Sequence, residues 1–183
     1  MAEQLMETTL RTALWQQFGA TIDMLENALL ACPSVHWNGL LWSDPRAPEY
    51  PTFWSITHHT LFWLDLYLTG SLEGFAPPSP FTLAELDPAG VLPERPYTRD
   101  ELHAYLVHLR KKCQTTIAGS SDEQVYQPVT FSWKKPMSFL ELLLYNMRHV
   151  QEHAAQLNMF LGQNAIDGAS DWVSRAKADE GGE

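Results

Sequence analysis

Residues 138–162 read SFLELLLYNMRHVQEHAAQLNMFLG, and this stretch decides how the rest of the chain is interpreted. Ser138 and Glu141 match the capping-box pattern that starts a helix, and apolar residues recur after them at helical spacing. Inside the segment, His149 and His153 are four residues apart, so their imidazoles share one helix face, one turn apart. With that spacing one helix can offer two nitrogens to one metal ion.

Three earlier segments show the same periodicity of apolar residues. They are residues 3–32, 52–68 and 98–119. The last of them starts at a second capping box, Thr98 with Glu101, and Gly70 and Gly162 are expected C-caps of their helices. Four long helices with apolar stripes predict an all-α four-helix bundle.

Two long connections, residues 33–51 and 71–97, separate these helices and contain four and six prolines. Long connections without secondary structure are uncommon in compact domains and often carry function. Residues 125–133 are expected to form a short extended piece before the last helix. We expect the bundle to span residues 1–165.

The remainder, residues 166–183, is expected to be a partly flexible C-terminal extension. It can hold a short fifth helix around residues 171–178, anchored by Trp172.

The composition restricts the functional class. Apolar residues make up 45% of the chain and the formal charge is -10, so we expect a globular protein that does not bind nucleic acid. Apolar runs are too short to span a membrane, and the N-terminus does not resemble a signal peptide, so a cytoplasmic location is expected. Cys32 and Cys113 are interpreted as reduced thiols in apolar segments.

A third metal ligand is expected from the pair His58-His59. Adjacent residues on a helix point about 100° apart, so only one of the two is expected to enter a shared site. Ile56, Trp63 and Leu66 lie on the side of His59, which favours His59 over His58. His58 is left to cap the helix, face solvent or hydrogen-bond a neighbour.

The other histidines are assigned to the surface or to a loop. His103 and His108 flank the apolar stripe of their helix, which indicates surface roles. His36 lies in an unusually aromatic loop that either walls a pocket or plugs one end of the bundle.

Glu152 belongs to a His-x-x-Glu-His pattern like that of inverzincin peptidases, but only 30 residues follow His153, too few for the later acidic ligand of those enzymes. Glu152 is instead interpreted as an orienting or salt-bridging residue near the histidines, with a role as catalytic base as the alternative. A ferritin-like di-iron site is also rejected, because the chain has no Glu-x-x-His pair.

The chain resembles the DinB/YfiT-like superfamily of metal-binding four-helix bundles in three respects. Residues 53–65, FWSITHHTLFWLD, look like the Trp-Ser and first-ligand histidine of that family's second helix. His149 and His153 near the end of the fourth helix, followed by Gln156-Leu157, match its second motif. The order of elements, with a long crossover before the third helix, is also similar.

The resemblance implies a three-histidine site of His59, His149 and His153 that holds a divalent ion, usually zinc or nickel. It further implies that the ion activates a low-molecular-weight thiol for S-transfer or isomerisation of a small-molecule substrate. A homodimer through a bundle face is implied as well. The family was first associated with DNA-damage induction, but the acidic composition gives no support for contact with DNA.

Three alternatives to a thiol-dependent transferase stay open. One is a metal-dependent hydrolase that uses metal-bound water, with Glu152 as proton acceptor. Another is a non-enzymatic metal-binding structural or stress-response protein, and the last is a bundle without metal. The trio Trp37, Trp42 and Trp54 is expected to supply apolar walls to a catalytic site.

Overall fold

The computed structural model describes residues 2–166 and 172–178 of the 183 residues. The secondary structure is almost entirely helical, as the periodicity predicts. The helices are α1 (Ala2–Ala31), α2 (Phe53–Thr69), α3 (Arg99–Gly119), α4 (Asp122–Tyr126) and α5 (Phe139–Gln163). A two-stranded antiparallel sheet joins β1 (Pro128–Val129) to β2 (Met137–Ser138), with Pro128 opposite Ser138.

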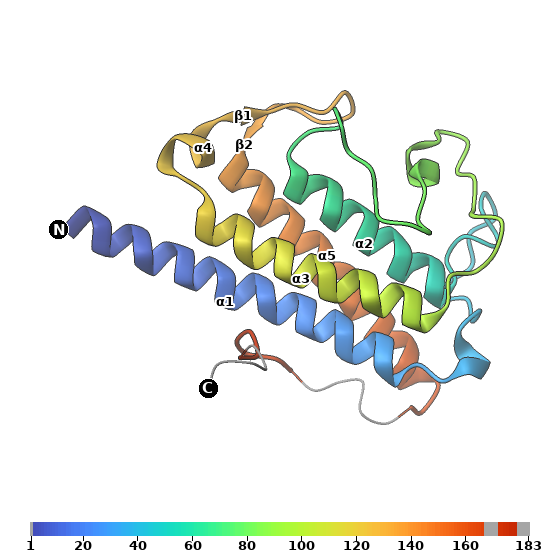
Figure 1. Ribbon diagram of the computed structural model, residues 1–183. Coiled ribbons are helices and arrows are strands. Elements are labelled where there is room, and N and C mark those ends of the chain that lie inside the picture. The colour runs from blue at the N-terminus through green and yellow to red at the C-terminus, as the bar shows by residue number, and fades with distance from the viewer. Residues whose placement is uncertain (1, 167–171, 179–183) are drawn as a thin grey trace.

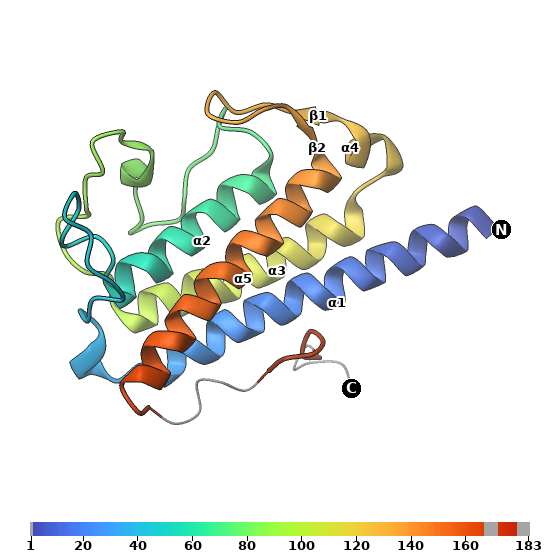
Figure 2. The same cartoon turned by 180° about the vertical axis from the view of Figure 1, so that it is seen from behind.

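The four long helices form the predicted bundle (Figure 1). Helix α1 packs against α3 and α5, and α2 packs against the same two helices. Helices α2 and α3 run in one direction, and α1 and α5 run in the other (Figures 1 and 2). Because α2 and α3 are parallel, the chain must return along the bundle between them, and residues 70–98 provide this crossover.

Buried polar groups tie the helices together between their apolar faces. Asp65 on α2 accepts a hydrogen bond from the Tyr105 hydroxyl at 2.7 Å and pairs with Lys112 Nζ at 2.6 Å, both on α3. On α5, Asn146 Nδ2 donates to the carbonyl of Leu64 at 3.1 Å. Because buried polar groups need specific partners, these contacts fix the register of α2 against both neighbours.

Most of the predicted helix ends are confirmed. Gly70 is the C-cap of α2 in the left-handed conformation (φ 74°), which glycine adopts without steric cost. Thr98 and Glu101 form a complete capping box, whereas Ser138 caps α5 by accepting from Glu141 N. The C-cap prediction for Gly162 is wrong, because α5 continues to Gln163 and its C-cap is Asn164.

The connections contain short elements. Helices of the 3-10 type lie in the first connection (η1, Ser34–His36) and in the crossover (η2, Leu83–Leu86). The extended piece predicted at residues 125–133 is only partly correct, because its start belongs to α4 and only Pro128–Val129 is a strand. Ser121 caps α4 with a capping box of its own, which favours the helical turn.

The C-terminal segment 172–178 runs along α1 without helical structure, so the predicted fifth helix is wrong over these residues. Its backbone bonds to the bundle instead of to itself. Ala176 N donates to the Gln16 carbonyl at 2.9 Å, and Lys177 N donates to Asp23 Oδ2 at 2.6 Å. Trp172 is 74% exposed and is not an anchor. Position 171 lies outside the described residues.

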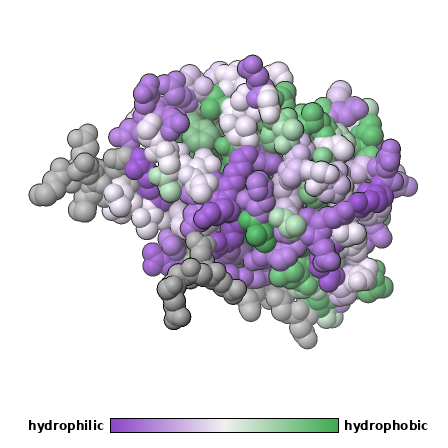
Figure 3. All heavy atoms as spheres, viewed as in Figure 1, coloured by the Kyte–Doolittle hydropathy of each residue, from purple (hydrophilic) through white to green (hydrophobic). Residues whose placement is uncertain are grey.

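The surface and the cysteines agree with a globular bundle. On the face shown in Figure 3, hydrophobic residues form small groups among hydrophilic ones. Cys32 and Cys113 are free and buried, as predicted, and burial raises the pKa of Cys32 to about 11. Among the described helices, none is long and apolar enough to cross a membrane.

Candidate metal centre

Three imidazoles from two helices meet on one side of the bundle. His59 Nε2 on α2 lies 3.4 Å from His149 Nε2 on α5, and His153 Nε2 lies 3.1 Å from that same nitrogen. One ring nitrogen of each histidine lies within 4.8 Å of the other two. The structure therefore brings together the three histidines singled out in the sequence, including His59 rather than His58.

The helices hold these rings by simple local rules. His149 and His153 share a face of α5 because they are one turn apart. The direction in which His59 points is fixed by where α2 begins, and there Thr52 and Ser55 form a reciprocal capping box. Since α2 packs directly on α5, one turn of α2 meets two turns of α5 at the site.

His59 is held from behind by a carboxylate that comes from the crossover. Glu85 Oε2, in η2, lies 2.8 Å from His59 Nδ1. The Tyr50 hydroxyl lies 2.8 Å from the same nitrogen and 3.3 Å from Glu85 Oε2. Burial opposes ionisation of Glu85, but hydrogen bonds from His58 and His59 and their charges lower its pKa to about 2. An ionised carboxylate only accepts hydrogen bonds, so His59 Nδ1 is the donor in this contact, and Nε2 is the nitrogen that faces His149.

Burial favours the neutral forms of the other two histidines. His153 Nδ1 lies 2.7 Å from the Gln156 side-chain oxygen, which leaves its Nε2 as the free nitrogen. Burial, with the nearby charges of His153 and His59, lowers the pKa of His149 to about 3. Burial lowers the pKa of His153 too. His149 Nδ1 is buried and has no hydrogen-bond partner among the described residues.

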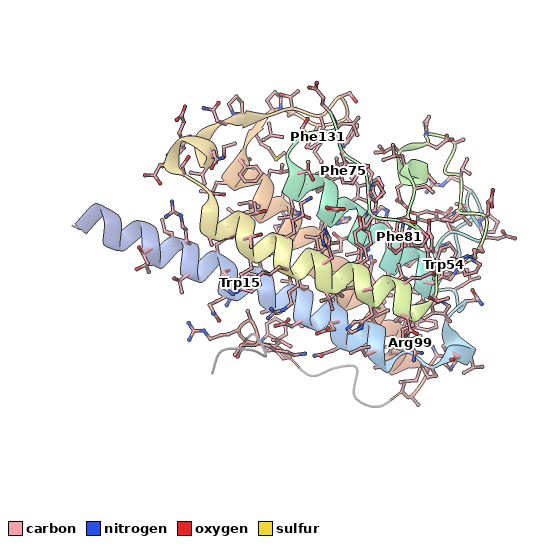
Figure 4. All side chains as sticks on the ribbon, viewed as in Figure 1. Trp15, Trp54, Phe75, Phe81, Arg99 and Phe131 are labelled. Carbon is pink, nitrogen blue, oxygen red and sulfur yellow. The ribbon has the colours of Figure 1, made fainter. Side chains whose placement is uncertain are left out.

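His58 points away from this centre into an aromatic pocket. Its side chain is 1% exposed, and its ring stacks on Phe81, which the crossover brings beside α2 (Figure 4). A second ring, that of Tyr97, lies 4.7 Å from it. His58 Nδ1 lies 3.6 Å from Glu85 Oε1, so both neighbouring histidines face one carboxylate from different sides.

The donor set fits a divalent metal ion. Zinc–imidazole bonds of about 2.0–2.1 Å in a tetrahedral site place ligand nitrogens about 3.3 Å apart, close to the separations of 3.1 and 3.4 Å found here. Outer nitrogens bonded to a carboxylate and an amide oxygen are the usual support for ligating histidines. Without an ion, neutral imidazoles would direct several lone pairs at one another.

Glu152 lies apart from the ligand contacts but close to the centre. It is exposed on α5 and lines a cavity of about 340 Å³ together with Tyr145, Arg148, His149 and Gln151. Its charge contributes to raising the pKa of His153, against the larger effect of burial. The structure thus places Glu152 in a cavity that borders His149.

The aromatic rings beside the histidines are not those expected. Trp37, in the aromatic loop that contains His36, contacts Phe53, and Trp54 on α2 contacts Tyr97. Both contacts lie at the end of the bundle, as expected if that loop plugs this end. Trp63 instead lies 6.2 Å from the ring of His59, and Tyr67 lies 6.5 Å from that of His149.

The remaining histidines behave largely as predicted. His108 is exposed, and His103 pairs with Glu26 at 2.9 Å. His36 contacts Phe160 edge to face.

Sequence reasoning missed Glu85 and Tyr50. Each lies in a proline-rich connection, where no helical spacing relates it to His59. The position of Gln156 three residues after His153 was a usable signal, since residues i and i+3 are neighbours on a helix.

Comparison with known proteins supports the same assignment. Residues 12–157 match the family model of the DinB superfamily. No curated protein and no solved structure matches the chain. The matched residues cover most of the chain and include all three histidines of the centre, so the chain belongs to the DinB superfamily.

Proposed function

We propose that His59, His149 and His153 hold one divalent ion, zinc or nickel, and that the protein uses it to activate a low-molecular-weight thiol for transfer to a small electrophilic substrate. The convergence of the three Nε2 atoms supports this proposal most directly. An ion held by three neutral imidazoles keeps a coordination position open and favours deprotonation of a thiol there.

The residues around the histidines have separate roles in this proposal. Glu85 and Tyr50 keep His59 Nδ1 protonated, and Gln156 does the same for His153. Trp63 and Tyr67 place aromatic rings beside His59 and His149, and their role in this proposal is to limit access of water. A drier site strengthens electrostatic interactions with a bound anion.

The position of Glu152 favours a second candidate, a metal-dependent hydrolase. Its exposed carboxylate lines the cavity next to His149, where it can accept a proton from a substrate water. The three ligands would be the same in both reactions. A non-enzymatic metal-binding protein is the third candidate, and it requires a site closed to added ligands.

Elemental analysis of protein purified without a histidine tag tests the metal centre. We expect about one divalent ion per chain, lost in H59A and H149A and kept in H108A, which removes an exposed histidine. Equal metal content in wild type and H149A would remove the basis of the proposal.

Two assays then separate the candidate functions. Conjugation of a thiol to an electrophile supports the transferase, whereas ester hydrolysis that falls in E152Q supports the hydrolase. Thiol and azide titrations of the cobalt-substituted protein cover the third candidate: a spectrum that never changes indicates a closed, non-enzymatic site.

A further inference from the structure

Cationic and aromatic groups gather beside His149 of the histidine centre. The cavity of about 340 Å³ on α5 is lined by His149 and by Tyr145, Arg148, Gln151 and Glu152. The loop between β1 and β2 lies on the same side of the bundle as α2 and the start of α5 (Figure 2). That loop adds Lys134, whose Nζ lies 3.6 Å from the centre of the Tyr145 ring.

Two cations of this region have no ion-pair partner among the described residues. Lys134 and Arg148 form no salt bridge with any carboxylate in the described part of the chain. Arg148 lines the cavity, and Lys134 lies over the ring of Tyr145, which also lines it, in a chain whose acidic residues outnumber basic ones by 22 to 12. The only described carboxylate that lines the cavity is that of Glu152.

Aromatic rings continue from Lys134 to the histidines. Lys134 Nζ also lies 5.1 Å from the Tyr67 ring centre, and the Tyr67 ring in turn contacts His149. Trp133, 43% exposed, packs on Trp63, whose indole lies beside His59. The Trp63 Nε1–H is buried without a hydrogen-bond partner among the described residues.

We propose that this region is a subsite for the anionic group of the substrate: a small organic carboxylate with an aromatic or apolar body. Lys134 and Arg148 pair with the carboxylate, and the rings of Tyr145 and Trp133 pack on the body. A carboxylate bound here is held next to His149. The inference rests on the proposed function, because it names the substrate class of that same site.

The physical basis is that the two cations can pair with a carboxylate, and the aromatic rings can pack on the apolar part of the same molecule. A lysine held over an aromatic ring is partly desolvated, so its attraction for an added anion is stronger than that of a free surface lysine. Arginine offers a planar pair of donors to a carboxylate. Glu152 opposes the anion, which makes its removal an informative test.

Binding of phenylacetate and of neutral phenylacetamide, followed by tryptophan fluorescence and calorimetry, tests the proposal in both metal-loaded and metal-free protein. We expect phenylacetate to bind more tightly than phenylacetamide. K134Q and R148Q should each weaken phenylacetate binding by about tenfold, the scale of one charge-assisted hydrogen bond. K134R should keep most of the affinity, and E152Q should tighten binding. Phenylacetamide should respond to none of these changes.

K111Q is the matched control, because it removes one exposed positive charge from α3, away from the cavity. An equal loss in K111Q and K134Q, or equal affinities for the acid and the amide, would overturn the subsite. Failure of the metal centre gives a different result. The wild type would then contain no divalent ion, while the preference for phenylacetate could still be scored on the metal-free protein.

Discussion

At the residue scale, the bond between Glu85 and His59 decides which imidazole nitrogen is free. An ionised Glu85 keeps the proton on His59 Nδ1 at 2.8 Å and so directs the Nε2 lone pair toward His149. The carboxylate also places a negative charge close to a site that would hold a divalent cation. Both effects favour binding of a metal ion.

Replacing Glu85 should therefore weaken metal binding without unfolding the bundle. We expect a loss of roughly 10- to 100-fold in zinc affinity for E85A, the usual effect of removing such a partner. E85Q should lose less, because its amide oxygen still accepts from His59 Nδ1. Competition with a chelator measures both affinities. E73Q, which changes an exposed glutamate of the same crossover, is the control, and equal affinities in E85A and wild type would contradict the role of Glu85.

The same residues show what sequence could and could not predict about the site. His149 and His153 follow from spacing within one helix, and His59 follows from the apolar side of α2. Glu85 and Tyr50 approach His59 only because both connections fold back over α2. Local patterns carry no information about that return, so this half of the centre was not predictable.

At the scale of single elements, the start of α3 shows how a helix cap depends on charge. Glu101 accepts hydrogen bonds from Arg95 and from Thr98 N. Those two contacts, that of Arg95 first, lower the pKa of Glu101 to about 2 from 4.5. The folded state therefore favours the ionised carboxylate, and the stability it contributes is complete above pH 4.5 and lost as the pH falls toward 2.

The E101Q variant should reveal this dependence. At neutral pH we expect its free energy of unfolding to fall by up to about 1 kcal/mol, the scale of a helix cap. The difference from wild type should shrink as the pH is lowered from 4.5 toward 2. Urea denaturation at several pH values measures it. D100N removes a charge from the same turn but keeps the contacts of Glu101, so a pH dependence equal to that of E101Q would argue against the cap.

Element ends were predicted where the cap lies in the local sequence, as at Gly70 and Thr98. The prediction failed at residues 172–178, where tertiary contacts replace the helix's own hydrogen bonds. Lys177 N bonds to the buried carboxylate of Asp23, which also pairs with Arg110 Nε at 2.9 Å. A short segment gains more from such partners than from a single isolated turn.

At the scale of the whole molecule, the connections and the C-terminal segment divide the bundle into two sides. The crossover and the β1–β2 hairpin lie on one side, with α2, whereas residues 172–178 lie along α1 on the other (Figures 1 and 2). A Cβ on Gly19 would lie 2.5 Å from Ala176 Cβ, closer than such atoms approach.

Homodimerisation and a cytoplasmic location stay predictions at this scale.

Substituting Gly19 with alanine should release the C-terminal segment from α1. We expect faster hydrogen exchange at the Ala176 and Lys177 amides and faster tryptic cleavage after Arg175, because the segment must move to accommodate the methyl group. In G162A the added Cβ meets no atom within 4 Å, so exchange at these amides should not change. Unchanged protection in G19A would show that the segment adjusts without detaching.

The close approach of Gly19 to Ala176 also has an evolutionary consequence. Two positions 157 residues apart share a space that admits hardly any side chain, so neither can drift independently of the other. Among homologous chains, those that keep the docked segment should retain glycine at the first position and a small residue at the second. Lineages that have lost the segment should be free to place alanine or a larger helix former at the first, and this covariation can be read from sequences alone.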